Sequence, residues 1–332
     1  MSPASPTVPL AEGDRGDPVR ELQRRLADLG FPLLFDEPGS YGPGTRAAVE
    51  AFQHRRGLRV DGVCGPETWG VLLEAGYRLG DRVLRLTDPM MRGDDVADLQ
   101  QRLSALGFDT GRVDGIYGPN TLAAVAEFQR NCGQEPDGIA HLSTQLALVR
   151  VETRQPAPPL VSTVRAREEL RRSPRTLAGR HVAVAGGQAL GTIVAALVRR
   201  LQGAGSRVTE LDHDDPSAQA AAANAAGVDL CLTLALRAEG AGCATSFYSG
   251  YRDESPGGRR LAELVQRTVP VAVRVPDLGI RGMSVPVLRE TRMPAVIVEI
   301  GPPALVVEQA PSLADALATA LSLWAGAPCE EE

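Results

Sequence analysis

The chain has 332 residues, 43% hydrophobic and 23% charged, which is typical of a globular protein long enough for two or three domains. Its formal net charge of −6 argues against non-specific nucleic-acid binding, which needs a basic surface. No apolar run approaches the roughly 18 residues of a membrane span, and the opening residues MSPASPTVPLAEGDRGD lack the basic and apolar regions of a secretory signal. The five cysteines are scattered and form no CxxC pair. We therefore expect a cytoplasmic protein with reduced thiols, no membrane span and no nucleic-acid partner.

The first half of the chain contains two copies of one sequence pattern. Residues 19–62 contain VRELQRRLADLGF, YGPGTRAAVEAFQ and VDG, and residues 96–138 contain VADLQQRLSALGF, YGPNTLAAVAEFQ and PDG in the same order. Each copy has apolar residues at helical spacing, a turn signal at Tyr-Gly-Pro and a second apolar stripe, which predicts a compact all-α module of three helices. We expect Thr45 and Thr121 to be the N-caps of the second helices.

These motifs resemble the type 1 peptidoglycan-binding domain family. The first copy carries the family pattern almost completely, including its closing G-P-x-T-W, whereas the second copy ends in DGIAHLST and departs from that closure. The resemblance implies two modules, over residues 10–76 and 84–150, that bind peptidoglycan or its precursor fragments. A degenerate second copy serving only as a protein-contact surface remains an alternative. The motif positions are Tyr41, Gly42, Pro43, Thr45 and Trp69 in the first module and Tyr117, Gly118, Pro119 and Thr121 in the second.

A linker and a second kind of domain follow the repeats. Residues 151–178 mix prolines with arginines, a composition typical of a linker. Over residues 179–327, short apolar strands alternate with helices, which predicts an α/β domain with a mostly parallel sheet flanked by helices. Strands are expected at residues 181–185, 206–211, 228–236, 244–249 and 294–301, and helices at residues 192–205, 217–227, 259–269 and 313–326.

The sequence VAVAGGQALGT, residues 182–192, runs from the first predicted strand into a glycine-rich loop. Ligand sites in α/β folds lie beyond the carboxyl ends of the strands, where this loop is expected. A dinucleotide site would use Gly186, Gly187 and Gly191, with Glu210 or Asp212 about twenty residues further on. The spacing here is GGxxxG rather than G-x-G-x-x-G, which makes a dinucleotide site a weak prediction.

The whole domain resembles the zinc-dependent N-acetylmuramoyl-L-alanine amidases of the amidase-3 family. The resemblance rests on VAVAGGQ, on AANAAGVDLCLTLAL and most specifically on LRETRMPAVIVEIG. It implies a zinc ion held by two histidines and a glutamate, with a second carboxylate that takes a proton from the zinc-bound water. Gln188 and Ala235 stand at the two histidine positions, and Glu299 matches the catalytic carboxylate. No acidic residue between Gln188 and Glu210 can supply the third ligand.

No other histidine in the sequence is a good candidate to replace the missing zinc ligands. His213 lies between Asp212 and Asp214, a pattern more typical of a solvated turn than of a metal site. We therefore expect no cofactor, with Glu299 left as a vestigial carboxylate and Gly187, Gln188 and Glu299 as a possible ligand pocket. Zinc is expected only if the domain is an active amidase after all.

A degenerate amidase-type domain behind two peptidoglycan-binding modules resembles the actinobacterial cytoplasmic regulators of this family. That resemblance implies activation of the UDP-N-acetylglucosamine enolpyruvyl transferase of peptidoglycan precursor synthesis. The lipid II flippase and a serine/threonine protein kinase are further implied partners, although the sequence ends in APCEEE without an evident phosphorylatable tail. The rival hypotheses are an active zinc amidase, which cleaves the muramoyl–peptide amide bond, and an exported wall-binding protein.

Overall fold

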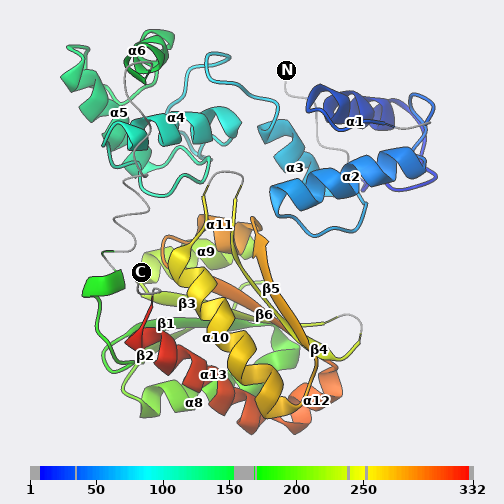
Figure 1. The fold of residues 1–332 in the computed structure, drawn as a ribbon, viewed down its shortest axis with the longest axis vertical. Helices are drawn as coiled ribbons and strands as arrows, with labels where there is room; N and C mark the ends of the chain where they lie inside the picture. Colours follow the sequence, from blue (N-terminus) through cyan, green and yellow to red (C-terminus); the bar gives the residue numbers. More distant parts are fainter. Residues whose placement is uncertain are drawn as a thin grey trace. The chain divides into compact units, whose positions relative to one another are not determined.

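The computed structural model describes residues 8–33, 36–152, 168, 170–237, 240–250 and 253–328. The chain divides into two compact units, residues 1–164 and residues 165–332, which are described separately (Figure 1). Most of the predicted linker, and Cys329, lie outside the described residues. Of the helices in the described segments, none is both long and apolar enough to cross a membrane.

The first unit contains the two predicted three-helix modules, which confirms that expectation. In each module, one-sided apolar stripes meet in a separate core; in the first, Val19, Leu22 and Leu26 pack with Val49 and Phe52. The helices are α1 (Asp17–Asp28), α2 (Pro43–Arg56) and α3 (Pro66–Glu74) in the first module, and α4 (Asp94–Ala105), α5 (Pro119–Asn131) and α6 (Leu142–Glu152) in the second.

The prediction that threonines cap the second helices is wrong. The N-caps of α2 and α5 are Gly42 and Gly118, and a proline occupies the first helical position in each. Thr45 and Thr121 therefore lie inside the helix, where both are buried. A glycine is required at position 42 because a Cβ atom there would collide with the Asp36 carboxylate.

The described part of the second unit contains a six-stranded sheet of order β2-β1-β3-β6-β4-β5. Only the β4–β6 pairing is antiparallel, so the prediction of a mostly parallel sheet is confirmed. All five predicted strands are present, and β5 is an additional strand at the sheet edge. The strands are β1 (His181–Gly186), β2 (Arg207–Leu211), β3 (Leu230–Leu236), β4 (Gly242–Tyr248), β5 (Asp277–Met283) and β6 (Ala295–Gly301).

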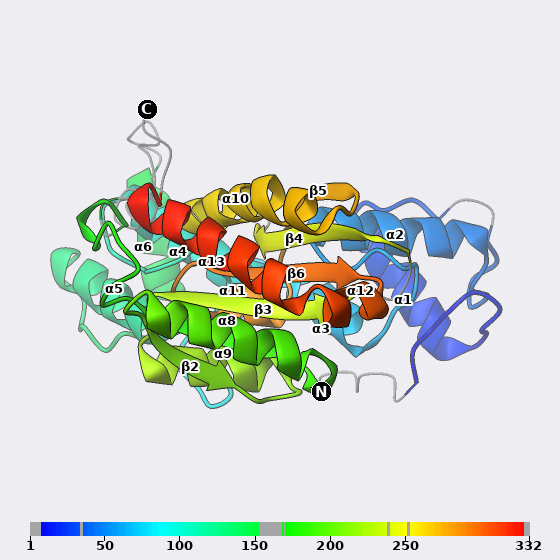
Figure 2. The ribbon, with the colours of Figure 1, turned by 90° about the horizontal axis from the view of Figure 1, so that it is seen from below.

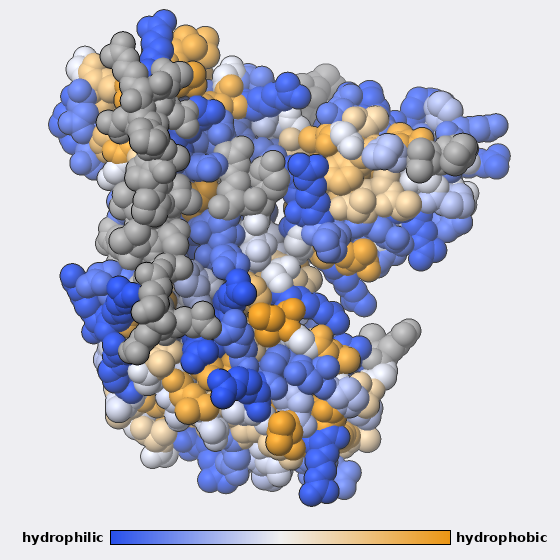
Figure 3. Space-filling model, viewed as in Figure 1, coloured by the Kyte–Doolittle hydropathy of each residue, from blue (hydrophilic) through white to orange (hydrophobic). Residues whose placement is uncertain are grey.

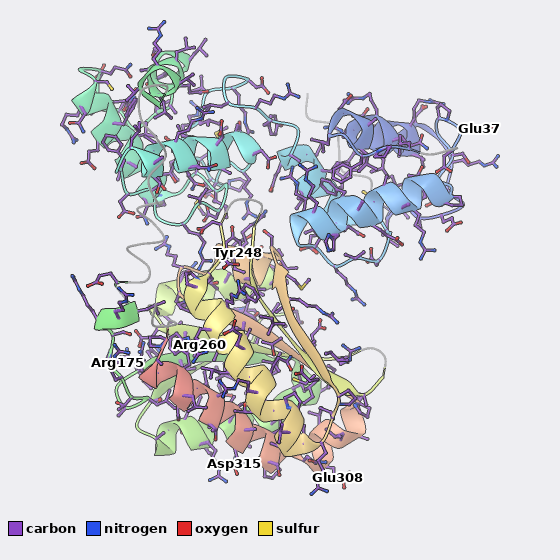
Figure 4. The ribbon with its side chains drawn as sticks, in the orientation of Figure 1. Glu37, Arg175, Tyr248, Arg260, Glu308 and Asp315 are labelled. Carbon is purple, nitrogen blue, oxygen red and sulfur yellow. The ribbon has the colours of Figure 1, made fainter. Side chains whose placement is uncertain are left out.

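Helices cover both faces of the sheet. On one face α13 lies between α8 and α10, as Figure 2 shows, and alternate apolar residues of the strands pack beneath them. An ion pair of 2.6 Å between Arg200 Nε and Asp315 Oδ1 joins α8 to α13 (Asp315 is labelled in Figure 4). These helices are α8 (Gly191–Gly203), α10 (Pro256–Val273) and α13 (Ala310–Gly326).

The opposite face carries the helices α9 (Pro216–Ala226) and α11 (Pro286–Glu290). Its core contains Ala183 and Ala185 of β1, Tyr248 at the end of β4 and residues of both helices. Two short elements follow the strand ends: the 3₁₀ turn η1 (Gln188–Leu190) after β1 and α12 (Pro303–Glu308) after β6. The loops that follow β1, β3 and β6 therefore share one edge of the sheet, because these strands run parallel.

Candidate functional site

The strand register brings the predicted amidase-type positions to the same edge of the sheet. Ala235 of β3 is the partner of Glu299 in β6, and Gly186 of β1 is the partner of Leu234, one residue earlier. Gly187 therefore follows β1 at the level of the Ala235–Glu299 pair. Gln188 is the first residue of η1, and its side chain lies outside the described part of the structure.

Glu299 is half-buried and lies between two alanines. Its partner in β3 is Ala235, and its partner in the antiparallel strand β4 is Ala244. Because side chains alternate along a strand, Glu299 points to the same face as Ala295 and Ile297, the face covered by α9 and α11. Among the described residues, the carboxylate takes part in no hydrogen bond or ion pair. Small apolar side chains thus flank a carboxylate that has no partner within the described ranges.

The side chains described at this edge do not fit a zinc ion. Zinc needs nitrogen, sulfur or oxygen donors, and the methyl group of Ala235 supplies none. An amide such as that of Gln188 is a poor zinc ligand beside imidazole or thiolate. No group of three or more His, Cys, Asp or Glu residues within the described ranges could hold a metal ion. His213, Asp212 and Asp214, which the sequence assigns to a turn rather than to a metal site, lie within those ranges.

Gly186, the first glycine of the VAVAGGQALGT loop, has a packing explanation. A Cβ atom at Gly186 would lie 2.8 Å from Cγ2 of Val194 and 3.3 Å from Cβ of Leu190, so a side chain there would push α8 away from β1. Gly187 and Gly191 have open space instead. The first glycine thus permits close strand–helix packing, which accounts for it without a bound nucleotide.

Asn224 is a structural residue whose role the sequence did not reveal. Its side-chain amide donates a hydrogen bond to the carbonyl of Glu290 at 2.8 Å and accepts one from the backbone N–H of Arg292 at 2.9 Å. It thereby ties α9 to the LRETRMP segment that leads into β6. This segment carries the strongest part of the amidase resemblance.

The tyrosines of the peptidoglycan-module motif are buried, and each forms a hydrogen bond within its own module. Tyr41 donates a hydrogen bond to the carbonyl of Gly62 at 2.7 Å, and Tyr117 donates one to Gly138 at 2.8 Å. Burial raises the pKa of both phenols well above its ordinary value. Trp69 is also buried. These side chains are therefore inaccessible to a ligand on the surface.

Buried glutamines complete the hydrogen-bond network inside each module, a role that their repeated positions in the sequence did not reveal. The amide nitrogen of Gln23 donates to Thr45 Oγ1 at 2.9 Å, and that of Gln100 donates to Thr121 Oγ1 at 3.0 Å. Gln53 and Gln129 similarly bind a threonine and an aspartate side chain each, together with three backbone groups for Gln53 and two for Gln129. Most residues of the motif therefore stabilise the fold of the module.

Asp36, rather than Thr45, stabilises the start of α2. Its carboxylate accepts hydrogen bonds from the backbone N–H groups of Gly42 at 3.1 Å, Gly44 at 3.2 Å and Thr45 at 2.5 Å. Burial raises the pKa of this carboxyl, but the hydrogen bonds from Thr45, Gly44 and Gly42 outweigh burial and hold the pKa below its ordinary value.

We expect Asp36→Asn to lower the free energy of unfolding of the first module by about 1 kcal/mol at neutral pH. Because the folded-state pKa is depressed, the wild type keeps this contribution above the unfolded pKa of about 3.9 and loses it as pH falls through the folded value. Urea unfolding at pH 7 and at pH 3 measures the difference, which should shrink at the lower pH. Glu37→Gln, an exposed neighbour labelled in Figure 4, is the control. Equal effects of the two substitutions at pH 7 would contradict the capping role.

Two family models agree with this division of the chain. A family model described as "Putative peptidoglycan binding domain" matches residues 15–72 and 92–148. One described as "N-acetylmuramoyl-L-alanine amidase" matches residues 190–302, beginning after Gln188. A solved N-acetylmuramoyl-L-alanine amidase structure from Clostridium difficile 630 covers 44% of this chain and 96% of its own, at 19% identity and a TM-score of 0.38.

Full-length relatives extend these matches. The chain is 36% identical over 160 residues to the amidase CwlL of Bacillus licheniformis, covering 42% of this chain and 44% of that protein. It is 33% identical over 330 residues to the N-acetylmuramoyl-L-alanine amidase CwlM of Mycobacterium tuberculosis, covering 87% of this chain and 80% of the relative. The chain therefore belongs to the N-acetylmuramoyl-L-alanine amidase family, with two peptidoglycan-binding domains preceding an amidase-type domain.

Proposed function

We propose that this chain is a catalytically degenerate member of its family that regulates peptidoglycan precursor synthesis in the cytoplasm. The observation that carries the proposal is the pairing of Ala235 with Glu299 at the edge where the family holds zinc. An alanine at a ligand position leaves the retained carboxylate without a metal-activated water to deprotonate. In this proposal the amidase-type domain keeps its fold, and the carboxyl ends of its strands serve to bind a ligand rather than to hydrolyse it.

The regulatory role follows from the resemblance to the actinobacterial regulators, supported by 33% identity to the Mycobacterium tuberculosis relative. The proposed target is the UDP-N-acetylglucosamine enolpyruvyl transferase, whose rate the chain would raise. The lipid II flippase and a serine/threonine kinase are further proposed partners, and peptidoglycan or precursor fragments are the proposed ligands of the modules. The edge formed by Gly187, Gln188 and Glu299 is the proposed pocket for such a fragment.

The test of the proposed function is the rate of the purified transferase with and without the purified full-length chain, before and after kinase treatment. We expect the chain to raise the transferase rate, and we expect Glu299→Ala to raise it equally, because no hydrolytic step is involved. If neither form of the chain binds the transferase or changes its rate, the regulatory proposal is wrong.

An active zinc amidase is the second candidate function. It is favoured by the family match over residues 190–302 and by a carboxylate that is half-buried and unpaired among the described residues at the expected strand position. Release of stem peptides from purified peptidoglycan separates the two candidates, because only the amidase cleaves the muramoyl–peptide amide bond.

A further inference from the structure

An open groove of about 490 Å³ lies on the surface of the second module. It is lined by Val83, Arg85, Thr87, Met91, Ile139 and His141. The guanidinium of Arg85 is exposed and forms no ion pair with any described residue. Apart from Arg85, Thr87 and His141, the lining side chains offer no strong hydrogen-bonding groups. The groove therefore combines an apolar wall with one available positive charge.

The loop that forms one side of this groove is longer than its counterpart in the first module. Bridges at Leu10 and Arg15 bound residues 11–14 in the first module, and bridges at Leu84 and Arg92 bound residues 85–91 in the second. The longer loop contains Leu86 and Met90, both of which are exposed. The two modules share their internal hydrogen-bond network but differ on this surface.

The closing helix extends the apolar surface. Leu142 and Leu146 of α6 are 54% and 48% exposed, and Val149 is exposed one turn further on, so the three side chains form a stripe at i, i+4 and i+7. The corresponding sequence of the first module, GPETWG, has Pro66 and Gly70 where α6 has Leu142 and Leu146. Figure 3 shows apolar side chains at the surface where Figure 1 places α6.

The stripe and the groove are neighbours in the sequence. Leu142 follows His141 of the groove lining, Leu86 lies between Arg85 and Thr87, and Met90 precedes Met91. We name these exposed residues, Val83, Leu86, Met90, Leu142, Leu146 and Val149, the α6 surface. Exposed apolar surface gathered in this way marks an interaction site rather than ordinary protein surface.

The chemistry of the α6 surface favours a polypeptide over a glycan. The hydroxyl groups of a sugar would need hydrogen-bond partners, and leucine, valine and methionine side chains supply none of comparable strength. An amphipathic segment could place apolar residues on the stripe, in the manner of a helix in a groove. The free charge of Arg85 complements a carboxylate on such a segment.

We infer that the second module is a protein-docking module whose α6 surface binds an apolar, carboxylate-bearing segment of the regulated enzyme. The inference rests on the proposed function, because the enolpyruvyl transferase is the enzyme that the chain would regulate. Peptidoglycan binding then belongs to the first module, which has Pro66 and Gly70 in place of the leucines of the α6 stripe.

The test compares full-length variants for binding to the purified transferase, with peptidoglycan sacculi as the second probe. The main variant is Leu142→Glu/Leu146→Glu. Glutamate is a good helix former at exposed positions, so α6 should fold normally. Circular dichroism checks this. We expect the dissociation constant for the transferase to rise about tenfold or more, with sacculus binding unchanged. Arg85→Glu should weaken transferase binding in the same direction. Leu323→Glu is the matched control, because Leu323 is 50% exposed on α13.

The outcomes separate the inference from the proposed function. If the wild type does not bind the transferase, the proposed function fails and the docking inference falls with it. If the wild type binds but the double variant binds equally well, the inference alone is overturned. Loss of sacculus binding with transferase binding retained would make the α6 surface a glycan site. A wild-type dimer that the double variant converts to monomers in analytical ultracentrifugation would make it a self-association surface.

Discussion

Replacing Gln53 with leucine is expected to lower the free energy of unfolding of the first module by about 2–4 kcal/mol. The amide nitrogen of Gln53 donates to Asp61 Oδ1 at 2.8 Å, to the carbonyl of Val63 at 3.0 Å and to Thr68 Oγ1 at 3.1 Å. Its carbonyl oxygen accepts from the N–H of Gly62 at 3.0 Å. Leucine has a similar volume, so the loss comes from buried polar groups left without partners rather than from a cavity.

Hydrogen exchange followed by mass spectrometry measures this effect in each module separately. In Gln53→Leu, amide protection should fall in α2 and α3 and remain unchanged in α5, whereas Gln129→Leu should produce the reverse pattern. Gln202→Leu, at an exposed position of α8, is the control and should change stability by no more than about 0.5 kcal/mol. If the three variants exchanged alike, the motif glutamines would have no special structural role.

Local patterns in the sequence predicted most of the fold. The repeats and the strand–helix alternation come from apolar periodicity, which directly reflects which side of each element is buried. The strand β5 was missed because its sequence, DLGIRGM, contains two glycines and an arginine, and its apolar alternation does not continue beyond Leu278 and Ile280. Its place at the sheet edge relaxes the need for apolar residues on both faces.

The sequence predicted which positions form the site, but it did not predict which side chains surround Glu299. The resemblance aligned Ala235 and Glu299, and the sheet register places them opposite each other. The sequence could not indicate that Ala244 of an antiparallel strand flanks Glu299 on its other side. Thr45 was misassigned for a related reason: a hydroxyl near a helix start is typical of an N-cap, and its actual partner, Gln23, is 22 residues away.

The largest functional effect expected is the absence of amidase turnover. A working member of the family needs three protein ligands for zinc and a carboxylate that deprotonates the bound water. Of the positions that the resemblance assigns, Ala235 has no donor atom, and Glu299 is not accompanied by a group of metal-binding residues within the described ranges. We therefore expect the wild type and Glu299→Gln to be alike in binding no stoichiometric zinc and in releasing no stem peptides.

Zinc content and peptidoglycan cleavage, measured on the same preparation, test whether the amidase-type domain has lost its metal and its activity. The full-length chain is saturated with zinc, dialysed, analysed for metal and incubated with purified peptidoglycan, beside an active amidase of the family as a positive control. We predict no stoichiometric zinc and no release of stem peptides. One zinc ion per chain, together with stem-peptide release that is abolished in Glu299→Gln, would contradict the account and identify the chain as an active amidase.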